Sequence, residues 1–257
     1  MTSGVLVVDK PRGPTSHDVV SWARRALGTR AVGHAGTLDP MATGVLVLGI
    51  GEGTKLTSFV MGEDKEYETT IALGAETDTL DAEGEVIATS DVPALDRAVV
   101  ERAAAMFVGT ISQRAPVVSA IKRDGVALHE RVRRGEDVVA PVREVRCDAI
   151  DVLDVREREI DLRVRCGKGF YVRSLGRDLA SALGTHGHLS ALRRTRIGEL
   201  GVDEAVAGEV LLRARGDDES AREIVRAGVR PLVRSLGSMA TVRVDEAGAR
   251  ELWHGRA

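Results

Sequence analysis

Two long stretches in the second half of the chain alternate apolar and polar residues, over 145–155 and 160–166. This period of two predicts a pair of neighbouring strands, because successive side chains of a strand point to opposite faces. Residues 81–84 have the composition of a hairpin turn ahead of apolar Val86 and Ile87. Shorter apolar or alternating runs predict further strands over 5–9, 45–48, 68–73 and 189–197.

Three other stretches carry apolar residues at helical spacing and predict helices over 17–27, 95–108 and 172–183. Ser16 stands where the cap of the first helix belongs, and Gly28 follows its last turn. Strands and helices do not alternate as they do in repeated βαβ units. The order therefore predicts an α+β domain with a mixed, mainly antiparallel central sheet flanked by helices and loops.

Residues 113–139 interrupt this regular pattern. The segment is irregular and basic, with one short helix expected over 128–134. It predicts an excursion from the core.

Composition narrows the class of protein. The 257 residues are 43% hydrophobic and 29% charged, which excludes disorder as the main state. Apolar runs stay shorter than the roughly 18 to 20 residues of a membrane span, and the N-terminus lacks the pattern of a secretion signal, so we expect a cytoplasmic protein with no membrane segment. Cys147 and Cys166 form no CxxC pair, which argues against a disulfide framework and most structural zinc sites.

The charges are segregated along the chain. The net charge of −3 argues against nucleic acid, but residues 63–102 carry −9 and residues 163–196 carry +7. The basic segment is able to bind phosphates. A solvated basic face explains it equally well on charge alone, since arginine makes up 31 of the 36 basic residues.

Three short motifs suggest chemistry that their spacing does not support. Gly49-Ile-Gly-Glu-Gly-Thr-Lys55 matches neither nucleotide-binding fingerprint, which favours a tight strand-to-helix turn. His186 and His188 have no third ligand at a convincing spacing, so no metal site is predicted. Ser16-His17-Asp18 has the letters of a triad, but consecutive side chains cannot converge.

Asp39 is different, because it lies in a loop with glycines at 33, 36 and 44 and is followed by Pro40. Such a loop fixes the backbone and lets a substrate approach closely, as a catalytic acid requires. An ordinary turn residue before proline is the other interpretation, and the residues alone leave both open.

A longer motif contains this loop. Gly33-His-Ala-Gly-Thr-Leu-Asp-Pro-Met-Ala-Thr-Gly-Val-Leu46 closely resembles the catalytic motif of the TruB family of tRNA pseudouridine synthases. The resemblance continues in order to about residue 200 through Val8-Asp-Lys-Pro-Arg-Gly13, Lys65-Glu-Tyr67, Thr77-Asp-Thr-Leu-Asp-Ala-Glu-Gly84, Ser119-Ala-Ile-Lys122, Gly167-Lys-Gly-Phe-Tyr-Val-Arg173 and Leu192-Arg-Arg194.

The resemblance implies a pseudouridine synthase fold and an isomerase that converts the T-loop uridine at tRNA position 55. Asp39 is then the catalytic carboxylate, acting as a nucleophile at the sugar or as a base on a glycal route. The reaction breaks the glycosidic bond and re-forms it at C5, so no cofactor and no metal is implied. An ionised Asp39 in a dry pocket requires a nearby cation. The resemblance supplies Arg173, expected on a strand with Tyr171 on the same face.

Further roles follow from the same resemblance. Tyr67 is expected to stack on the uracil, Leu192 to close the apolar side of the pocket, and His34 to enter the RNA and help extrude the nucleotide. Contacts to the T-arm stem-loop are expected from Arg12 and a set of basic residues that comprises Lys10, Lys122, Arg193 and Arg194.

The resemblance also predicts the domain organisation. Residues 1–237 are expected to form the catalytic domain, with 113–139 as a thumb loop. The sequence has no evident self-association motif, so a monomer is expected. Residues 238–257 resemble the opening strand and helix of a PUA-like RNA-binding domain and are expected to be an incomplete copy of it. Two other functions stay open: a tRNA-folding factor whose catalysis is incidental and, less favoured, a glycoside hydrolase, for which Asp39 has no obvious second carboxylate.

Overall fold

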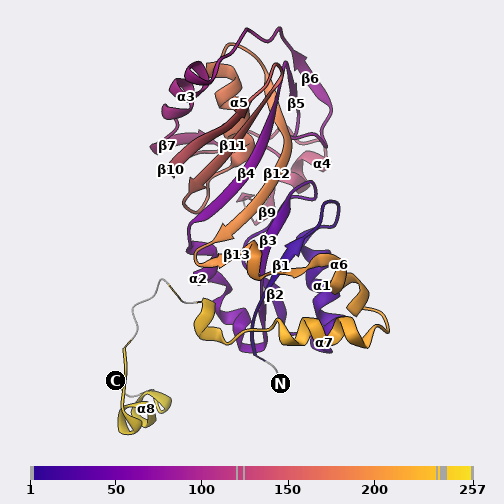
Figure 1. The fold of residues 1–257 in the computed structure, drawn as a ribbon, viewed down its shortest axis with the longest axis vertical. Helices are drawn as coiled ribbons and strands as arrows, with labels where there is room; N and C mark the ends of the chain where they lie inside the picture. Colours follow the sequence, from indigo (N-terminus) through magenta and orange to yellow (C-terminus); the bar gives the residue numbers. More distant parts are fainter. Residues whose placement is uncertain (1–2, 120, 124, 236, 238–241, 256–257) are drawn as a thin grey trace.

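One mixed sheet runs through the molecule (Figure 1), and the computed structural model describes residues 3–119, 121–123, 125–235, 237 and 242–255. Within that part the strand order is β14-β1-β3-β12-β4-β11-β10-β7, with β2 added to β3 and β13 to β12. The strands of this sheet are β1 (Gly4–Lys10), β2 (Val32–His34), β3 (Thr43–Ile50), β4 (Lys65–Leu73), β7 (Gly109–Arg114), β10 (Val142–Val155), β11 (Glu159–Cys166), β12 (Gly187–Ile197), β13 (Leu200–Gly201) and β14 (Val206–Ala207).

The pairing of these strands is mainly antiparallel. The pairs β1–β14 and β3–β12 are parallel, and the other described pairs of the sheet are antiparallel. Both long strands predicted from alternation, β10 and β11, form and pair with each other. The predicted α+β fold with a mixed sheet is confirmed.

Helices cover this sheet at both ends. Figure 1 shows α1, α6 and α7 around β1–β3, and α3 and α5 at the opposite end. The helices are α1 (Ser16–Leu27), η1 (Gly51–Leu56), α2 (Thr57–Gly62), α3 (Arg97–Ala105), α4 (Leu128–Arg133), α5 (Val172–Ala182), η2 (Val202–Glu204), α6 (Gly208–Ala214), α7 (Glu219–Ala227), η3 (Leu232–Ser235) and α8 (Glu246–Trp253). No helix in the described ranges is long and apolar enough to cross a membrane.

The helix bounds differ from the prediction where a cap was misplaced. Thr15, not Ser16, caps α1: its hydroxyl accepts from the Asp18 N–H, and the Asp18 carboxylate accepts from the Thr15 N–H in return. Asp96 caps α3, which therefore begins at Arg97 and not at 95.

The core lies between α5 and one face of the sheet. Ile71 of β4, Leu162 of β11 and Leu189 of β12 are buried there with Leu175 of α5. The helix approaches closely because Gly176 has no side chain: a Cβ there would lie 2.7 Å from Leu189. On β4 and β11 the opposite face carries mainly polar and charged residues, as the period of two predicts. On β1 and β3 that face is also buried, in a second apolar cluster with Val5, Val7, Val45 and Val47.

That polar face brings the two charged segments together. Strand β4 of the acidic segment pairs with β11 on one side and β12 on the other, and both of these strands carry arginines of the basic segment. Arg163, directly opposite Glu68 in the register, donates to it at 2.8 Å. Much of the +7 charge of residues 163–196 is therefore matched by the fold and not free for phosphate.

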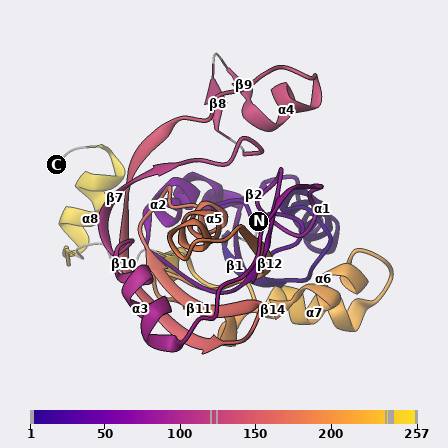
Figure 2. The same ribbon diagram turned by 90° about the horizontal axis from the view of Figure 1, so that it is seen from above.

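Two smaller features lie outside the main sheet. The predicted hairpin forms from β5 (Ala75–Thr77) and β6 (Val86–Thr89). Residues 115–141, between β7 and β10, carry β8 (Lys122–Arg123), β9 (Val126–Ala127) and α4, and Figure 2 shows this segment projecting away from the sheet. It corresponds to the predicted excursion.

The C-terminal segment returns to the N-terminal half as far as the structure describes it. β14 pairs with β1, and Arg230 bridges to Val5 of that strand. Of the predicted PUA-like opening strand, residues 240 and 241 lie outside the described part, and 242–245 form no strand. The predicted helix forms as α8.

Candidate active site

The loop of residues 35–42 joins β2 to β3 and presents Asp39, and side chains from outside the loop hold its backbone. Ser16 binds both polar groups of Leu38: its Oγ accepts from the Leu38 N–H at 2.9 Å and donates to the Leu38 carbonyl at 3.1 Å. Arg194 donates to the carbonyls of Gly36 at 3.2 Å and Thr37 at 3.5 Å. The residues before Asp39 are therefore anchored from two directions.

Lys10 anchors the other side of the loop. Its ammonium donates to the carbonyls of Pro40 at 3.2 Å and Ala42 at 2.7 Å. Gly44 ends the loop with a φ of +96°, and a Cβ there would lie 2.1 Å from the Arg194 carbonyl. Only glycine permits that backbone conformation and the close approach of β3 to β12.

These contacts correct two expectations. Lys10 is 0% exposed and Arg194 is 2% exposed, so neither lies on a surface where RNA phosphates gather. Buried carbonyls need donors, and a loop without regular pairing obtains them from long basic side chains. Burial lowers the pKa of Lys10 to about 8, although the Asp39 carboxylate opposes this shift.

Arg173 meets Asp39 from the opposite side of the site. Its Nε lies 2.9 Å from Asp39 Oδ2, and only 5% of the arginine side chain is exposed. The expected strand position is wrong, because α5 begins at Val172 and Tyr171 is its N-cap residue. Arg173 thus lies in the first turn of a helix. The two residues still reach one pocket, but from a helix start and not from a strand face.

The rest of the guanidinium of Arg173 is also bound. Nη1 donates to the Thr79 carbonyl at 2.7 Å and lies 3.4 Å from Asp81 Oδ2. Nη2 donates to the Val118 carbonyl at 3.0 Å. The guanidinium is therefore held in place by backbone as well as by charge, which leaves its Nε directed at Asp39.

Asp81 is a site residue that the sequence reasoning did not identify. It is buried, receives the Thr79 hydroxyl at 2.7 Å and the Glu83 N–H at 3.1 Å, and supplies a second carboxylate to Arg173. Within the described ranges, the preceding Leu80 is the non-glycine residue with a positive φ, at 63°. The signal was the motif of residues 77–84, which was recognised but given no role.

Burial and charge act against each other on Asp39. Desolvation raises the pKa of its carboxyl, Asp81 adds to that rise, and Arg173 and Lys10 oppose it. Its side chain remains 35% exposed, toward the adjoining pocket. The carboxylate is thus partly stripped of water but keeps a cation, which makes it more basic than an ordinary aspartate.

A pocket of about 350 Å³ adjoins the carboxylate. Tyr67 of β4 and Leu192 of β12 lie on adjacent strands and line it, and burial raises the pKa of the Tyr67 phenol. The predicted site residues that line this one pocket are Asp39, Tyr67, Tyr171, Arg173, Leu192 and Arg194.

His34 lies at the end of β2 and does not line the pocket. Its ring meets that of His17 edge-on, with ring centroids 5.2 Å apart. Its Nδ1 is buried and has no hydrogen-bond partner among the residues described. Burial lowers the pKa of His34, which favours a neutral ring.

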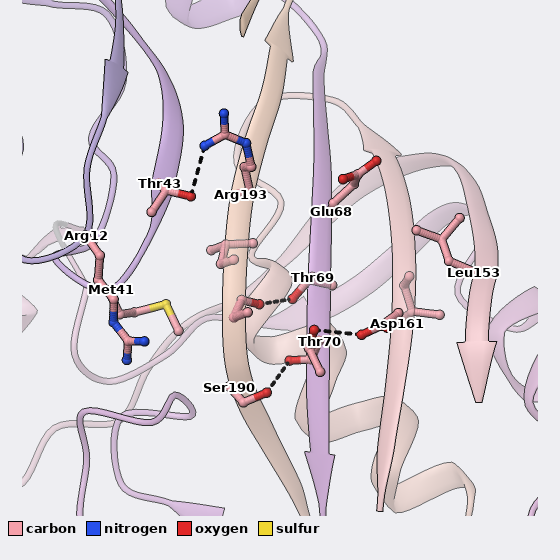
Figure 3. Close-up of a pocket in the computed structure, with 13 residues that line it drawn as sticks. Arg12, Met41, Thr43, Glu68, Thr69, Thr70, Leu153, Asp161, Ser190 and Arg193 are labelled. Atoms are coloured by element: carbon pink, nitrogen blue, oxygen red, sulfur yellow. Dashed lines mark hydrogen bonds between the residues drawn. The ribbon is translucent and has the colours of Figure 1, made fainter. Parts of the chain in front are cut away.

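Arg193 points to the opposite face of the sheet, where a second hollow of about 430 Å³ lies (Figure 3). Its guanidinium forms two bonds with Asp9, at 3.0 and 2.8 Å, and lies 3.4 Å from the Thr43 hydroxyl. The expected phosphate contact therefore competes with a carboxylate. Lys122 forms part of β8, and its side chain lies outside the described part.

The remaining motifs have structural partners. His186 Nδ1 lies 3.2 Å from Glu76, and His188 Nδ1 lies 2.9 Å from the Ala75 carbonyl, so both attach the β5 strand. A Cβ on Gly49 would lie 2.3 Å from the Gly53 carbonyl, which explains that motif as a tight turn. Among the described side chains no group of three or more potential ligands could hold a metal ion.

Comparison with known proteins agrees with this geometry. Residues 24–172 match the model of the TruB family pseudouridylate synthase N-terminal domain, and residues 173–237 match that of the tRNA pseudouridylate synthase B C-terminal domain. The tRNA pseudouridine synthase B of Corynebacterium glutamicum strain R is 52% identical over 206 residues, which cover 79% of this chain and 69% of that protein.

Two further comparisons extend over nearly the whole chain. The tRNA pseudouridine synthase B of Leifsonia xyli subsp. xyli is 45% identical over 263 residues, covering 99% of this chain and 83% of that protein. A chain in the crystal structure of a Cbf5-Nop10-Gar1 complex is 26% identical with a TM-score of 0.74, and the match covers 98% of this chain and 67% of that one. With an arginine-paired aspartate at the catalytic-motif position, this chain belongs to the TruB family of pseudouridylate synthases.

Proposed function

We propose that the chain isomerises uridine to pseudouridine in tRNA, at the T-loop uridine of position 55. The observation that carries the proposal is the ion pair between Asp39 and Arg173, 2.9 Å long, beside a pocket lined by Tyr67 and Leu192. An anion poised beside a pocket of ligand-binding size is what attack at a nucleoside sugar requires. The names of the relatives, tRNA pseudouridine synthase B, support tRNA as the substrate.

The chemistry uses the ionised carboxylate. Asp39 either bonds to C1′ of the ribose or removes the C2′ proton, and in both routes the C1′–N1 bond breaks. The freed uracil turns between Tyr67 and Leu192. On the first route C5 then displaces the Asp39 carboxylate from C1′; on the second, C5 bonds to C1′ of the glycal and Asp39 returns the proton to C2′. On both routes C5 loses its proton and N1 ends protonated. Arg173 keeps Asp39 ionised and oriented, because a guanidinium remains charged and holds a carboxylate in a defined geometry.

The remaining assignments belong to the same proposal. His34 enters the RNA as the nucleotide leaves its stack, and Tyr171 borders the pocket. The T-arm contacts Arg12 and residues 113–139, including Lys122. The catalytic unit spans 1–237, residues 238–257 contribute a PUA-like RNA-binding segment, and the protein acts as a monomer in the cytoplasm.

Release of tritium from C5-tritiated uridine in a T-arm stem-loop RNA tests the proposal. The purified chain is expected to release label, and nucleotide-resolution mapping of treated tRNA is expected to place pseudouridine at position 55. Asp39→Asn is the control and is expected to release none. Equal release by this variant, or a product at another position, would contradict the proposal. A benefit in cells that survives Asp39→Asn would instead support a tRNA-folding role.

A further inference from the structure

Gln113 is the single glutamine of this chain, and the sequence contains no asparagine. Its side chain is therefore the only carboxamide among 257 residues, whereas carboxylates and guanidiniums are abundant. It lies near the end of β7, directly before the projecting segment of residues 115–141, and is 2% exposed. A buried amide has a high cost unless both of its polar atoms are bonded.

Both polar atoms are bonded, and to one residue. The Tyr171 N–H donates to Gln113 Oε1 at 2.9 Å, and Gln113 Nε2 donates to the Tyr171 carbonyl at 3.1 Å. The orientation of the amide is unambiguous, because a backbone N–H can only donate and a carbonyl can only accept. A carboxamide carries a neutral donor and a neutral acceptor on one planar group, and Gln113 supplies the one carboxamide of this sequence.

The residue that Gln113 holds is the start of α5. Tyr171 is the N-cap residue of that helix, with extended backbone angles and no side-chain cap. Its carbonyl also accepts from the Leu175 N–H at 3.1 Å, as the first turn requires. The amide therefore fixes the peptide unit at which the chain changes from extended to helical.

A second contact joins the same two elements. The Ser174 hydroxyl donates to the Arg114 carbonyl at 2.8 Å, so consecutive residues of β7 hold α5 on both sides of Arg173. Arg173 itself donates to the carbonyl of Val118, a few residues further along the same segment. Residues 113–118 thus bind the start of α5 and one nitrogen of the guanidinium, while Thr79 and Asp81 bind another.

We propose that Gln113 is a positioning residue: through the Tyr171 peptide it places Arg173 against Asp39 and Tyr171 at the pocket wall. This rests on the proposed function, since it assigns a role within that site. Gln113 does not line the pocket, so it acts on the rate of the chemical step and not on RNA contacts. A displacement of about 1 Å at a reacting group can cost about a hundredfold in rate.

Gln113→Glu tests the positioning role, because its effect on the rate is expected to depend on pH. The protonated carboxyl can accept from the Tyr171 N–H and donate to its carbonyl, whereas the ionised form faces that carbonyl with an acceptor. Burial and the facing carbonyl raise the pKa of a carboxyl here, and nearby cations lower it. The charged and titratable groups around this position are Arg143 on β10, Arg114 on β7, Tyr171 directly before α5, Arg173 and Arg177 on α5, and Asp39 beyond Arg173.

The measurement is single-turnover tritium release between about pH 6 and pH 8.5, expressed as variant over wild type at each pH so that titration common to both cancels. Gln113→Glu is expected to lose about ten- to hundredfold in rate at high pH and to recover toward wild type as pH falls, with the KM changed less than about threefold. Gln113→Met, which fills similar space without hydrogen bonds, is expected to stay low at every pH.

The outcomes separate the two proposals. An inactive wild-type chain would overturn the proposed function. If the wild type is active, two results would overturn the positioning role. In the first, the rate of Gln113→Glu relative to wild type is near one at every pH. In the second, that relative rate stays as low as that of Gln113→Met at every pH. A Ser112→Glu variant places the same carboxylate on the exposed neighbour and is expected to show a ratio that does not change with pH.

Discussion

The two sides of the site are held in different ways. The Asp39 loop is anchored by Lys10 and Ser16 from the N-terminal segment and by Arg194 from β12. The start of α5 is instead held by β7 and the residues after it, 55 to 60 positions earlier in the chain. Arg173 is bound in addition by Thr79 and Asp81. The carboxylate side is therefore anchored by side chains of β1, α1 and β12. The cation side depends in part on the residues at the base of the projecting segment.

The difference indicates how the pocket can be assembled. Loop carbonyls bonded to buried cations are difficult to move without leaving unpaired groups. The start of α5, by contrast, follows any movement of residues 113–118, since Gln113, Arg114 and Val118 all bind it. We expect changes on the carboxylate side to alter chemistry and pKa values, and changes on the cation side to alter chemistry together with stability.

Asp39→Asn is expected to have the largest effect, a loss of activity of at least about a thousandfold, because a reacting group is removed. Stability should not fall. Burial raises the pKa of Asp39, so its ionised form opposes folding at pH values above that raised pKa, and a neutral amide removes the opposition. Thermal unfolding at pH 7 is expected to give an equal or higher Tm; a large decrease would show that the ion pair stabilises the fold.

Arg173→Lys is expected to have the second-largest effect, a loss of about a hundredfold in kcat. Lysine keeps the charge but cannot reach Asp39, Thr79 and Val118 at once. Because buried carbonyls then lack a donor, the free energy of unfolding should fall by about 2 kcal/mol. Urea unfolding and single-turnover rates measure the two effects; loss of activity without loss of stability would contradict the contrast drawn above.

Ser16→Ala is expected to reduce kcat about tenfold, because the Leu38 N–H and carbonyl both lose their side-chain partner. The matched control is Thr15→Ala, which removes the helix cap from the neighbouring position without touching the loop. This control should cost about 1 kcal/mol of stability and leave kcat near wild type. Equal kcat losses in both would show that α1, not the loop contact, is responsible.

Two variants are expected to shift the acid limb of the pH–rate profile in opposite directions. Activity falls as Asp39 is protonated, so the limb lies above the pKa of about 3.9 of an ordinary aspartate. Asp81→Asn removes a charge that raises the pKa of Asp39, and the limb moves to lower pH. Lys10→Met removes a charge that lowers it, and the limb moves to higher pH. Shifts in the same direction would assign the limb to another group.

Arg193→Ala is expected to have the smallest effect, less than about threefold on affinity for a T-arm stem-loop, because Asp9 already binds the guanidinium. Arg12 is exposed and has no ion pair among the described residues, so Arg12→Ala serves as the matched comparison. It should weaken binding more and reduce the salt dependence by about one phosphate contact. The reverse order would restore Arg193 as an RNA contact.

The strands were predictable because alternation records which side chains are buried. Ile160, Leu162 and Val164 of β11 face the core, and the residues between them carry charge, so the period is explicit in the sequence. The site residues Asp39, Tyr67 and Leu192 came from resemblance of their motifs, and the structure brings them to one pocket. Whether they catalyse is what the variants above measure.

The partners of these residues could not be predicted in the same way. A basic residue bonded to loop carbonyls, such as Lys10 or Arg194, has the same letter as one that binds phosphate. The resemblance placed Arg173 on a strand, whereas helical spacing predicted a helix from 172; α5 confirms the helix, and Gln113 binds the Tyr171 peptide at its start. That contact joins residues 58 positions apart, and a local pattern does not contain it.

The hydrogen bond between Arg173 and the Val118 carbonyl also has a consequence for inhibitor design. A compound wedged between α5 and residues 115–118 would not need to resemble a nucleobase. By separating the Val118 carbonyl from the Arg173 guanidinium, it would remove one of the bonds that hold the cation against Asp39. The carboxylate would then lose its orientation without direct contact with the compound. Such a ligand would lie outside the pocket beside Asp39, and resistance to it would have to arise at the base of the projecting segment.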